Sequence, residues 1–271
     1  MSIVSFIARP IEQDGRNSTL HMAVRYGGDP DIPRFLLDHG ADVSAINAHG
    51  CTPLHFAAMT SANAEVISLL LDRGADPRAS DQDGFTPLHA AAALNTDPTC
   101  TRLLISHGAQ TEAMATDYSR PIHLASAFNS NFLVIKHLLL AGADPNTPGP
   151  HQFTALHLTV LNVNSRRSSD ITEQILPLLF HFGANLEAID CNGRTALHLA
   201  AITSDHTDII EWLLQHGADA KAADFGSRTP LQLARQHAKV PDIIQLLEYS
   251  HKNELTIPKA NDNRCSKCSY L

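Results

Sequence analysis

Apolar and polar positions follow one another along the chain in blocks of a fixed order. A short alanine-rich apolar stretch, such as residues 54–58, precedes a longer one, such as residues 66–71, and a polar stretch then ends at Gly84. Apolar residues at helical spacing predict two helices per block, and the polar stretch predicts a hairpin-like turn, or finger. Thr52-Pro53 suits the start of the first helix, because threonine is a good N-cap and proline fits the first helical position.

The blocks share a phrase, threonine-proline-leucine-histidine or a near copy of it. Successive copies are 34 residues apart, apart from one step of 41. A second phrase, glycine-alanine followed by an acid or amide, keeps the same register, so the long step contains a seven-residue insertion within residues 162–170. The seven copies end at His21, His55, His89, His123, His157, His198 and Gln232.

Two segments carry the pattern most clearly, T-P-L-H-F-A-A at residues 52–58 and L-L-D-R-G-A-D at residues 70–76. They resemble the motifs of the ankyrin-repeat family, and the resemblance covers about residues 16–248. It implies an all-α ankyrin-repeat solenoid of stacked helix–turn–helix units with hairpin-like fingers, in which stacking buries the apolar faces. These repeats have 34 residues where the family usually has 33, and we place the extra residue between the two helices.

The flanking segments predict two further parts. Residues 1–15 are expected to form an N-terminal cap that packs Ile3, Val4, Phe6 and Ile7 on the first repeat. Residues 16–248 form the repeat domain of seven repeats, and residues 249–271, which are polar and rich in turn formers, are expected to be a flexible C-terminal tail. Insertions and caps aside, the fold implies little about function, because one fold serves many functions.

Composition narrows the class of protein further. The 271 residues are 44% hydrophobic, which fits a folded chain, and the formal charge of −8 argues against nucleic acid as a ligand. No apolar stretch approaches the roughly 18 residues of a membrane-spanning helix, and residues 2–8 are too short for a signal peptide core. Five cysteines without a disulfide pattern indicate a reducing cytoplasmic or nuclear setting.

The 16 histidines are explained by the repeat rather than by chemistry. The motif histidines lie one repeat apart and cannot converge on one metal ion, so we expect each ring to bond the backbone of the adjoining finger, as is typical of the family. A second set is expected to cap the carbonyl end of the second helices: His39, His107, His181 and His216.

The cysteines and the known catalytic motifs indicate neither a metal site nor an enzyme. Cys51, Cys100 and Cys191 are expected to be buried or half-buried, and the single pair Cys265 and Cys268 lacks the second pair that zinc needs. No nucleophile elbow, phosphate-binding loop, dinucleotide-binding glycine run or zinc-protease motif occurs. We therefore expect no catalytic residue, no cofactor and no metal.

The family usually binds partner proteins on its concave side, made of finger tips and the exposed face of the first helices. Four or five residues beyond the motif histidine, six repeats carry an apolar residue: Tyr26, Met59, Leu94, Phe128, Leu161 and Ile202. We call these six residues the apolar stripe. Either it is an exposed patch that marks a binding site, or the extra inter-helix residue re-angles the helices and buries some of these side chains.

The finger tips supply the remaining candidates for partner contact. Phe85, Phe153 and Phe225 are aromatic anchors if exposed, although a phenylalanine beside the threonine can instead pack on the next finger. Irregular residues gather near the fourth and fifth repeats, where a Pro148-Gly149-Pro150 finger precedes the insertion. The full set of expected partner-binding residues is the apolar stripe together with Phe85, Tyr118, Arg120, His151, Phe153, Arg194 and Phe225.

The last four residues, Cys268-Ser269-Tyr270-Leu271, have the C-a-a-X form of a prenylation site. Cys265 could carry a palmitate as a second anchor, and Ser269 with Leu271 alternatively fits a PDZ-type carboxyl-terminal ligand. Three functions stay open. The first is a non-catalytic, monomeric protein-interaction module, an adaptor or scaffold. The second is a lipid-anchored signalling adaptor or host-directed effector, tethered to a membrane only through the tail. The third, least favoured, is an auxiliary or enzymatic role in a biosynthetic pathway.

Overall fold

Helices occur in pairs throughout the part of the chain that the structure describes. This is a computed structural model, and it describes residues 16–26, 29–60, 64–162, 170–203, 206–237 and 241–252. Within these ranges there is no β-strand, which confirms the expected all-α class. The chain divides into two compact units, residues 1–150 and 151–271, and each is considered by itself.

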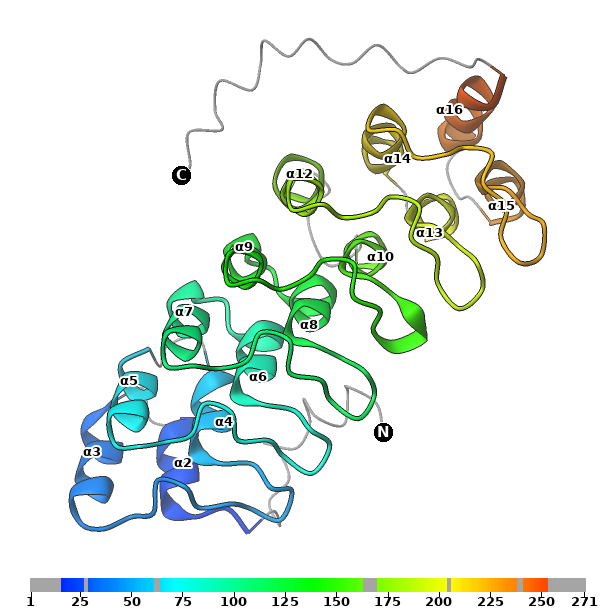
Figure 1. Ribbon diagram of the computed structural model, residues 1–271. Coiled ribbons are helices and arrows are strands. Elements are labelled where there is room, and N and C mark those ends of the chain that lie inside the picture. The colour runs from blue at the N-terminus through cyan, green and yellow to red at the C-terminus, as the bar shows by residue number, and fades with distance from the viewer. Residues whose placement is uncertain are drawn as a thin grey trace. The chain divides into compact units, whose positions relative to one another are not determined.

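The first unit holds four helix pairs, each made of a first and a second helix (Figure 1). The first helices pack on one another in chain order, as do the second helices α5, α7 and α9. Fully buried leucines and isoleucines such as Leu54, Leu88 and Ile122 fill the space between the two rows. The pairs are α2 (Thr19–Tyr26) with α3 (Asp31–Asp38), α4 (Pro53–Ala58) with α5 (Ala64–Asp72), α6 (Pro87–Leu94) with α7 (Pro98–Ser106), and α8 (Pro121–Phe128) with α9 (Phe132–Leu140).

The second unit repeats the arrangement with three pairs. A short 3-10 turn, η2 (Pro150–Gln152), precedes the first pair, and a single π-helical turn, η4 (Ile171–Ile175), leads into the second helix of that pair. The predicted insertion lies mostly in residues 163–169, outside the described residues. The pairs are α10 (Ala155–Leu161) with α12 (Leu176–His181), α13 (Ala196–Thr203) with α14 (Thr207–Gln215), and α15 (Pro230–His237) with α16 (Pro241–Lys252).

The last helix extends beyond the predicted end of the repeat domain. Helix α16 reaches Lys252, four residues past Glu248, so Tyr249 continues the helix instead of beginning the tail. The expected N-terminal cap, residues 1–15, and residues 253–271 lie outside the described residues. None of the helices within the described ranges is both long and apolar enough to cross a bilayer.

Two asparagines in the turns between first and second helices tie neighbouring repeats together. The Asn95 side chain is buried and its Nδ2 donates to the carbonyl oxygens of Ala58 and Thr60, at 3.1 and 2.9 Å. Asn129 repeats this one repeat later, donating to Ala92 and Asn95 at 3.0 and 2.8 Å. The inter-helix turn is thus a link between repeats, because each buried amide satisfies carbonyls that the preceding helix end leaves open.

Candidate partner-binding surface

The fingers are held in place by the motif histidines. In the second repeat, the Thr52 backbone N–H donates to Nδ1 of His55 at 3.0 Å, and His55 Nε2 lies 3.0 Å from the Phe85 carbonyl oxygen in the next finger. A backbone amide can only donate, so Nδ1 must be unprotonated and Nε2 must carry the proton that bonds the carbonyl. The ring is therefore neutral and joins the start of a first helix to the following finger.

The same arrangement recurs at all six motif histidines, which confirms the sequence prediction. Each Nε2 lies between 2.8 and 3.2 Å from a finger carbonyl oxygen. Burial lowers the pKa of His55 and of His89 to about 4, more than the carbonyl bonds raise it. Burial also lowers the pKa of His21, His123, His157 and His198, so the array favours neutral rings.

Neighbouring fingers are joined by backbone hydrogen bonds near their tips. In the first unit Gln82 N–H donates to the His49 carbonyl at 3.0 Å, and Thr116 N–H donates to the Asp83 carbonyl at 2.8 Å. In the second unit the Phe225 N–H bonds Asn192 in the same way, at 3.0 Å. Pro150 has the equivalent place in its finger and has no N–H to donate.

One position of each finger requires a left-handed backbone. Gly50 and Gly84 have φ near +80° there, and Tyr118 takes the same conformation with φ of 68°. The finger of the fourth repeat therefore keeps the shape of its neighbours although it has lost the glycine, and the strain falls on Tyr118. Its side chain is 63% exposed, which leaves the ring available at the surface.

Arg120, which replaces the threonine in that repeat, connects two consecutive fingers. Its guanidinium forms an ion pair with Glu112 at 3.1 Å and donates to the Pro148 carbonyl at 3.3 Å. The following finger has a different backbone from the others. His123 Nε2 bonds the Thr147 carbonyl at 2.8 Å, 24 residues along the chain, where His21, His55 and His89 bond a carbonyl 30 residues along. Gly149 lies so close to the His123 ring that a Cβ there would be 2.8 Å from it. Arg120 thus links the two fingers through its guanidinium, and its side chain is only 20% exposed.

The apolar stripe is neither fully exposed nor fully buried. Tyr26 at the end of α2 and Phe128 at the end of α8 are exposed, at 68% and 44%. Met59 and Leu94, in the repeats between them, are half-buried. In the second unit Leu161 and Ile202 are also half-buried. Exposure therefore holds for Tyr26 and Phe128 and partial burial for the other four residues, while the role of the stripe in binding stays a prediction.

The finger phenylalanines differ from one another. Phe85 is only 4% exposed and packs edge-on against the His89 ring at a centroid distance of 5.4 Å, so it lacks the exposure that the anchor role required. Phe153 is half-buried between the rings of His151 and His157, each 5.9 Å away. Phe225 is 73% exposed.

Phe225 and the exposed His151 lie on fingers of the second unit. The Phe225 ring packs against the backbone of Gly193, where a Cβ would come within 2.5 Å of it. His151 has a left-handed backbone with φ of 55° and accepts the Cys191 N–H through its carbonyl. Cys191 itself is exposed, contrary to the expectation of a buried or half-buried thiol, whereas Cys51 and Cys100 are buried as expected.

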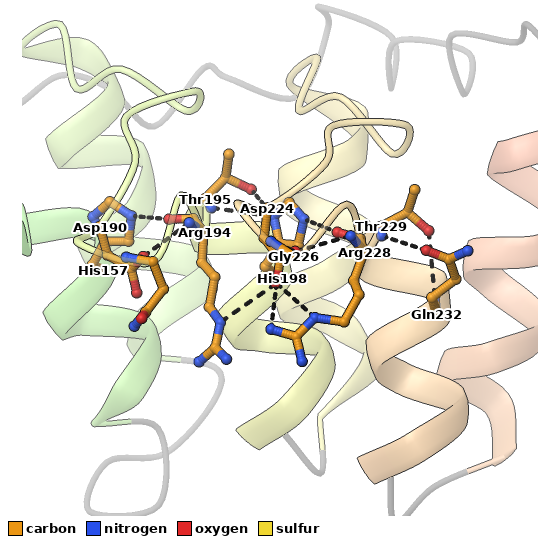
Figure 2. A network of polar contacts seen from close by, with 11 residues as sticks. His157, Asp190, Arg194, Thr195, His198, Asp224, Gly226, Arg228, Thr229 and Gln232 are labelled. Atoms are coloured by element: carbon orange, nitrogen blue, oxygen red, sulfur yellow. Dashed lines mark hydrogen bonds and ion pairs between the residues drawn. The ribbon is translucent and has the colours of Figure 1, made fainter.

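A polar network joins the last two fingers of the second unit (Figure 2). Arg194 and Arg228 leave successive fingers and end on either side of the Asp224 carboxylate. Arg228 donates to Asp224 Oδ2 from Nε at 3.0 Å and from Nη2 at 2.8 Å, and Arg194 Nε lies 3.9 Å from the same oxygen. Arg228 and Asp224 were not among the predicted site residues, although Asp190 and Arg194 show the same four-residue spacing one repeat earlier.

The remaining histidine and cysteine expectations have mixed outcomes. Three of the second-helix histidines cap their helix as predicted, with Nδ1 between 2.7 and 2.9 Å from a carbonyl oxygen four residues earlier: His39, His107 and His216. Among the described residues no group of three His, Cys, Asp or Glu side chains is placed to hold a metal ion. Cys265 and Cys268 lie outside the described residues.

Comparison with known proteins agrees with this geometry. The family model "Ankyrin repeats (3 copies)" matches residues 3–81, 20–115, 58–149, 122–224 and 165–257. Among solved structures, the human ASB11 ankyrin repeat domain has a similar fold, with a TM-score of 0.74 and 22% sequence identity. The match covers 86% of this chain and 97% of that domain. At this identity the likeness concerns the fold alone.

Proposed function

The chain belongs to the ankyrin-repeat family, whose repeats generally serve protein–protein interaction, and from this premise we propose that it is a non-catalytic interaction module. It acts as an adaptor or scaffold that binds a partner protein on the face formed by the fingers and the first helices. The proposal includes a monomeric chain in a cytoplasmic or nuclear setting. An auxiliary or enzymatic role in a biosynthetic pathway has no residue in its favour among those described.

The observation that carries the proposal is the exposure of large apolar side chains on this face. Tyr26 and Phe128 on first helices and Tyr118 on a finger are all exposed by more than two fifths. Burial of apolar surface favours association, and aromatic side chains dominate interface energetics. Met59 and Leu94, which are half-buried, supply the apolar residues at this position in the two intervening repeats.

Quantitative affinity capture with mass spectrometry tests the proposal. Phe128→Arg places a charge on the proposed face, and Leu140→Arg is the matched control, because Leu140 is a 62% exposed apolar residue on the second helix of the same repeat. Both variants should fold like the wild type by circular dichroism. We expect Phe128→Arg to lose the captured partner and Leu140→Arg to keep it. Loss with the control alone would place the partner on the second helices and contradict the proposal.

A second candidate function is favoured by the C-a-a-X form of the last four residues. In that case the same face serves a lipid-anchored signalling adaptor or host-directed effector, with Cys268 prenylated and Cys265 palmitoylated. Expression in a eukaryotic cell, followed by fractionation and intact mass, compares the wild type with Cys268→Ser. A mass increase and membrane association that depend on Cys268 support the anchored form. Identical soluble distributions without a mass increase contradict it.

A further inference from the structure

The two arginines of the second unit share one carboxylate unequally. Arg194 and Arg228 occupy the same position of successive fingers, one residue before the threonine that starts a first helix. Arg228 binds Asp224 Oδ2 through two N–H groups, at 3.0 and 2.8 Å. Arg194 is an ion-pair neighbour of the same oxygen, at 3.9 Å, too far for a hydrogen bond. Figure 2 shows the two guanidinium groups side by side around this carboxylate.

Asp224 has no further acceptor capacity to offer Arg194. Its Oδ1 accepts the backbone N–H groups of Gly226 and Arg228, both at 2.9 Å, and a carboxylate has about four lone-pair sites in all. The Asp224 side chain is fully buried. Burial raises the pKa of Asp224, but hydrogen bonds from Arg228 outweigh it and lower the pKa, so the carboxylate stays ionised. Asp190, the equivalent carboxylate one repeat earlier, accepts the backbone N–H groups of Asn192 and Arg194 at its Oδ1, not the Arg194 guanidinium.

Arg194 consequently keeps a guanidinium without a hydrogen-bond acceptor in the described part of the chain. Its Nε is buried and unbonded, although its side chain as a whole is 27% exposed. A buried donor without a partner destabilises the folded chain, and the exposed remainder of the guanidinium is open to an acceptor from outside. Two guanidinium charges thus share the one carboxylate of Asp224, on a chain whose formal charge is −8.

The surroundings indicate what kind of acceptor fits. Guanidinium groups form planar, two-pronged hydrogen bonds that match a carboxylate. Gly193 precedes Arg194, and the ring of Phe225, a residue that is 73% exposed, packs against the Gly193 backbone. The exposed aromatic ring thus packs on the residue that precedes Arg194, and both side chains belong to fingers. This combination suits a peptide segment in which an acidic residue has an apolar neighbour.

We propose that Arg194, supported by Arg228, binds a glutamate or aspartate side chain of a partner protein, and that Phe225 packs against the neighbouring apolar residue. The proposal rests on the proposed function, since it assigns a chemistry to the partner segment that contacts the fingers. Under this proposal, the second unit is the part of the chain that recognises the partner's negative charge. The exposed aromatic residues of the first unit would then contribute contact area.

Selection of a random peptide library on the immobilised full chain provides the test. We expect the enriched peptides to contain an acidic residue beside an apolar one. Replacing that acidic residue by its amide should weaken binding about tenfold or more, and so should Arg194→Gln. Arg102→Gln is the matched control, because Arg102 is an exposed arginine on α7 of the first unit, and it should leave binding unchanged. The peptide substitution needs no protein variant, so the test does not depend on the folding of Arg194→Gln.

The outcomes separate this inference from the function on which it rests. Peptides without acidic enrichment, or binding that is equal with Arg194→Gln, overturn the carboxylate site and leave a peptide-binding face in place. A selection that enriches no peptide overturns the carboxylate site as well. The proposed function is judged independently, by loss of the captured partner with Phe128→Arg.

Discussion

Acidification should unfold this protein through its motif histidines. His55 and His89 are fully buried, and their pKa values are lowered from 6.5 to about 4. Between these two pH values the unfolded chain binds more protons than the folded chain, so stability falls as the pH falls. Each shift of about 2.5 units corresponds to about 3 kcal/mol per ring, lost by pH 4. Two rings alone thus contribute an amount comparable with the roughly 5–15 kcal/mol stability of a typical protein.

The chain itself provides the control for this prediction. In the last repeat Gln232 replaces the histidine, and its Oε1 accepts the Thr229 N–H at 2.9 Å just as the ring nitrogen does elsewhere (Figure 2). Glutamine can therefore keep the hydrogen bond from the threonine N–H, and it does not titrate. We expect His55→Gln/His89→Gln to remain folded at pH 7 with a shallower dependence of stability on pH.

Urea unfolding followed by far-ultraviolet circular dichroism, at about pH 7, 6 and 5, gives the slope of stability against pH for both proteins. Near pH 5 the double variant should have a slope smaller than the wild type by about 2–3 kcal/mol per pH unit. Carboxylates titrate equally in both proteins and cancel in the comparison. Equal slopes would refute the reasoning, because they would mean that the buried rings do not exclude the proton.

Three substitutions test the local geometry of fingers and turns by the free energy of unfolding in urea. Tyr118→Gly should stabilise by about 0.5–1 kcal/mol, since relief of the left-handed strain exceeds the entropy that glycine adds to the unfolded chain; a loss of stability would contradict it. Gly149→Ala should destabilise by about 1–3 kcal/mol, because its Cβ would meet the His123 ring; unchanged stability would show that the finger can move away. Asn129→Ala should destabilise by about 2 kcal/mol through two buried carbonyls left unbonded, whereas a neutral result would mean that water replaces the amide.

The repeat register made much of the fold predictable. Thr52-Pro53 and its copies fix where the first helices begin, and the constant spacing to the glycine phrase fixes where the second ones end. The histidine-to-finger bonds follow from the same register, because every repeat places equivalent atoms at equivalent distances. His123 departs from its neighbours for a reason that lies in another segment. Its finger contains Pro148 and Pro150, and the altered backbone presents Thr147 to the ring instead.

Exposure was the property that the sequence could not assign. Phe85 directly precedes the threonine, at a position whose carbonyl bonds the motif histidine of the preceding repeat, whereas Phe225 lies four residues before its threonine, at a finger tip. Sorting the two by register, rather than by residue type, would have separated them. Phe128 and Leu94 lie at the same position of successive repeats and yet only Phe128 is exposed, so register alone does not predict exposure there.

The Arg194–Asp224–Arg228 network is visible in part in the sequence. An acid followed four residues later by an arginine occurs in two successive fingers, at Asp190 and at Asp224. What the spacing does not reveal is the unequal sharing, in which Arg228 takes the hydrogen bonds and Arg194 does not. That asymmetry depends on distances of about an ångström, which only the folded chain defines.

Site-specific photo-crosslinking in cells tests the central claim most directly. A photoreactive phenylalanine analogue replaces Phe128 on the first helix of the fourth repeat or, in a second protein, Leu140 on the second helix of the same repeat. Both side chains are exposed, so both reagents can reach a bound partner. The account predicts a crosslinked protein partner from position 128 and none from position 140. Adducts from position 140 alone, or from neither position, would contradict it.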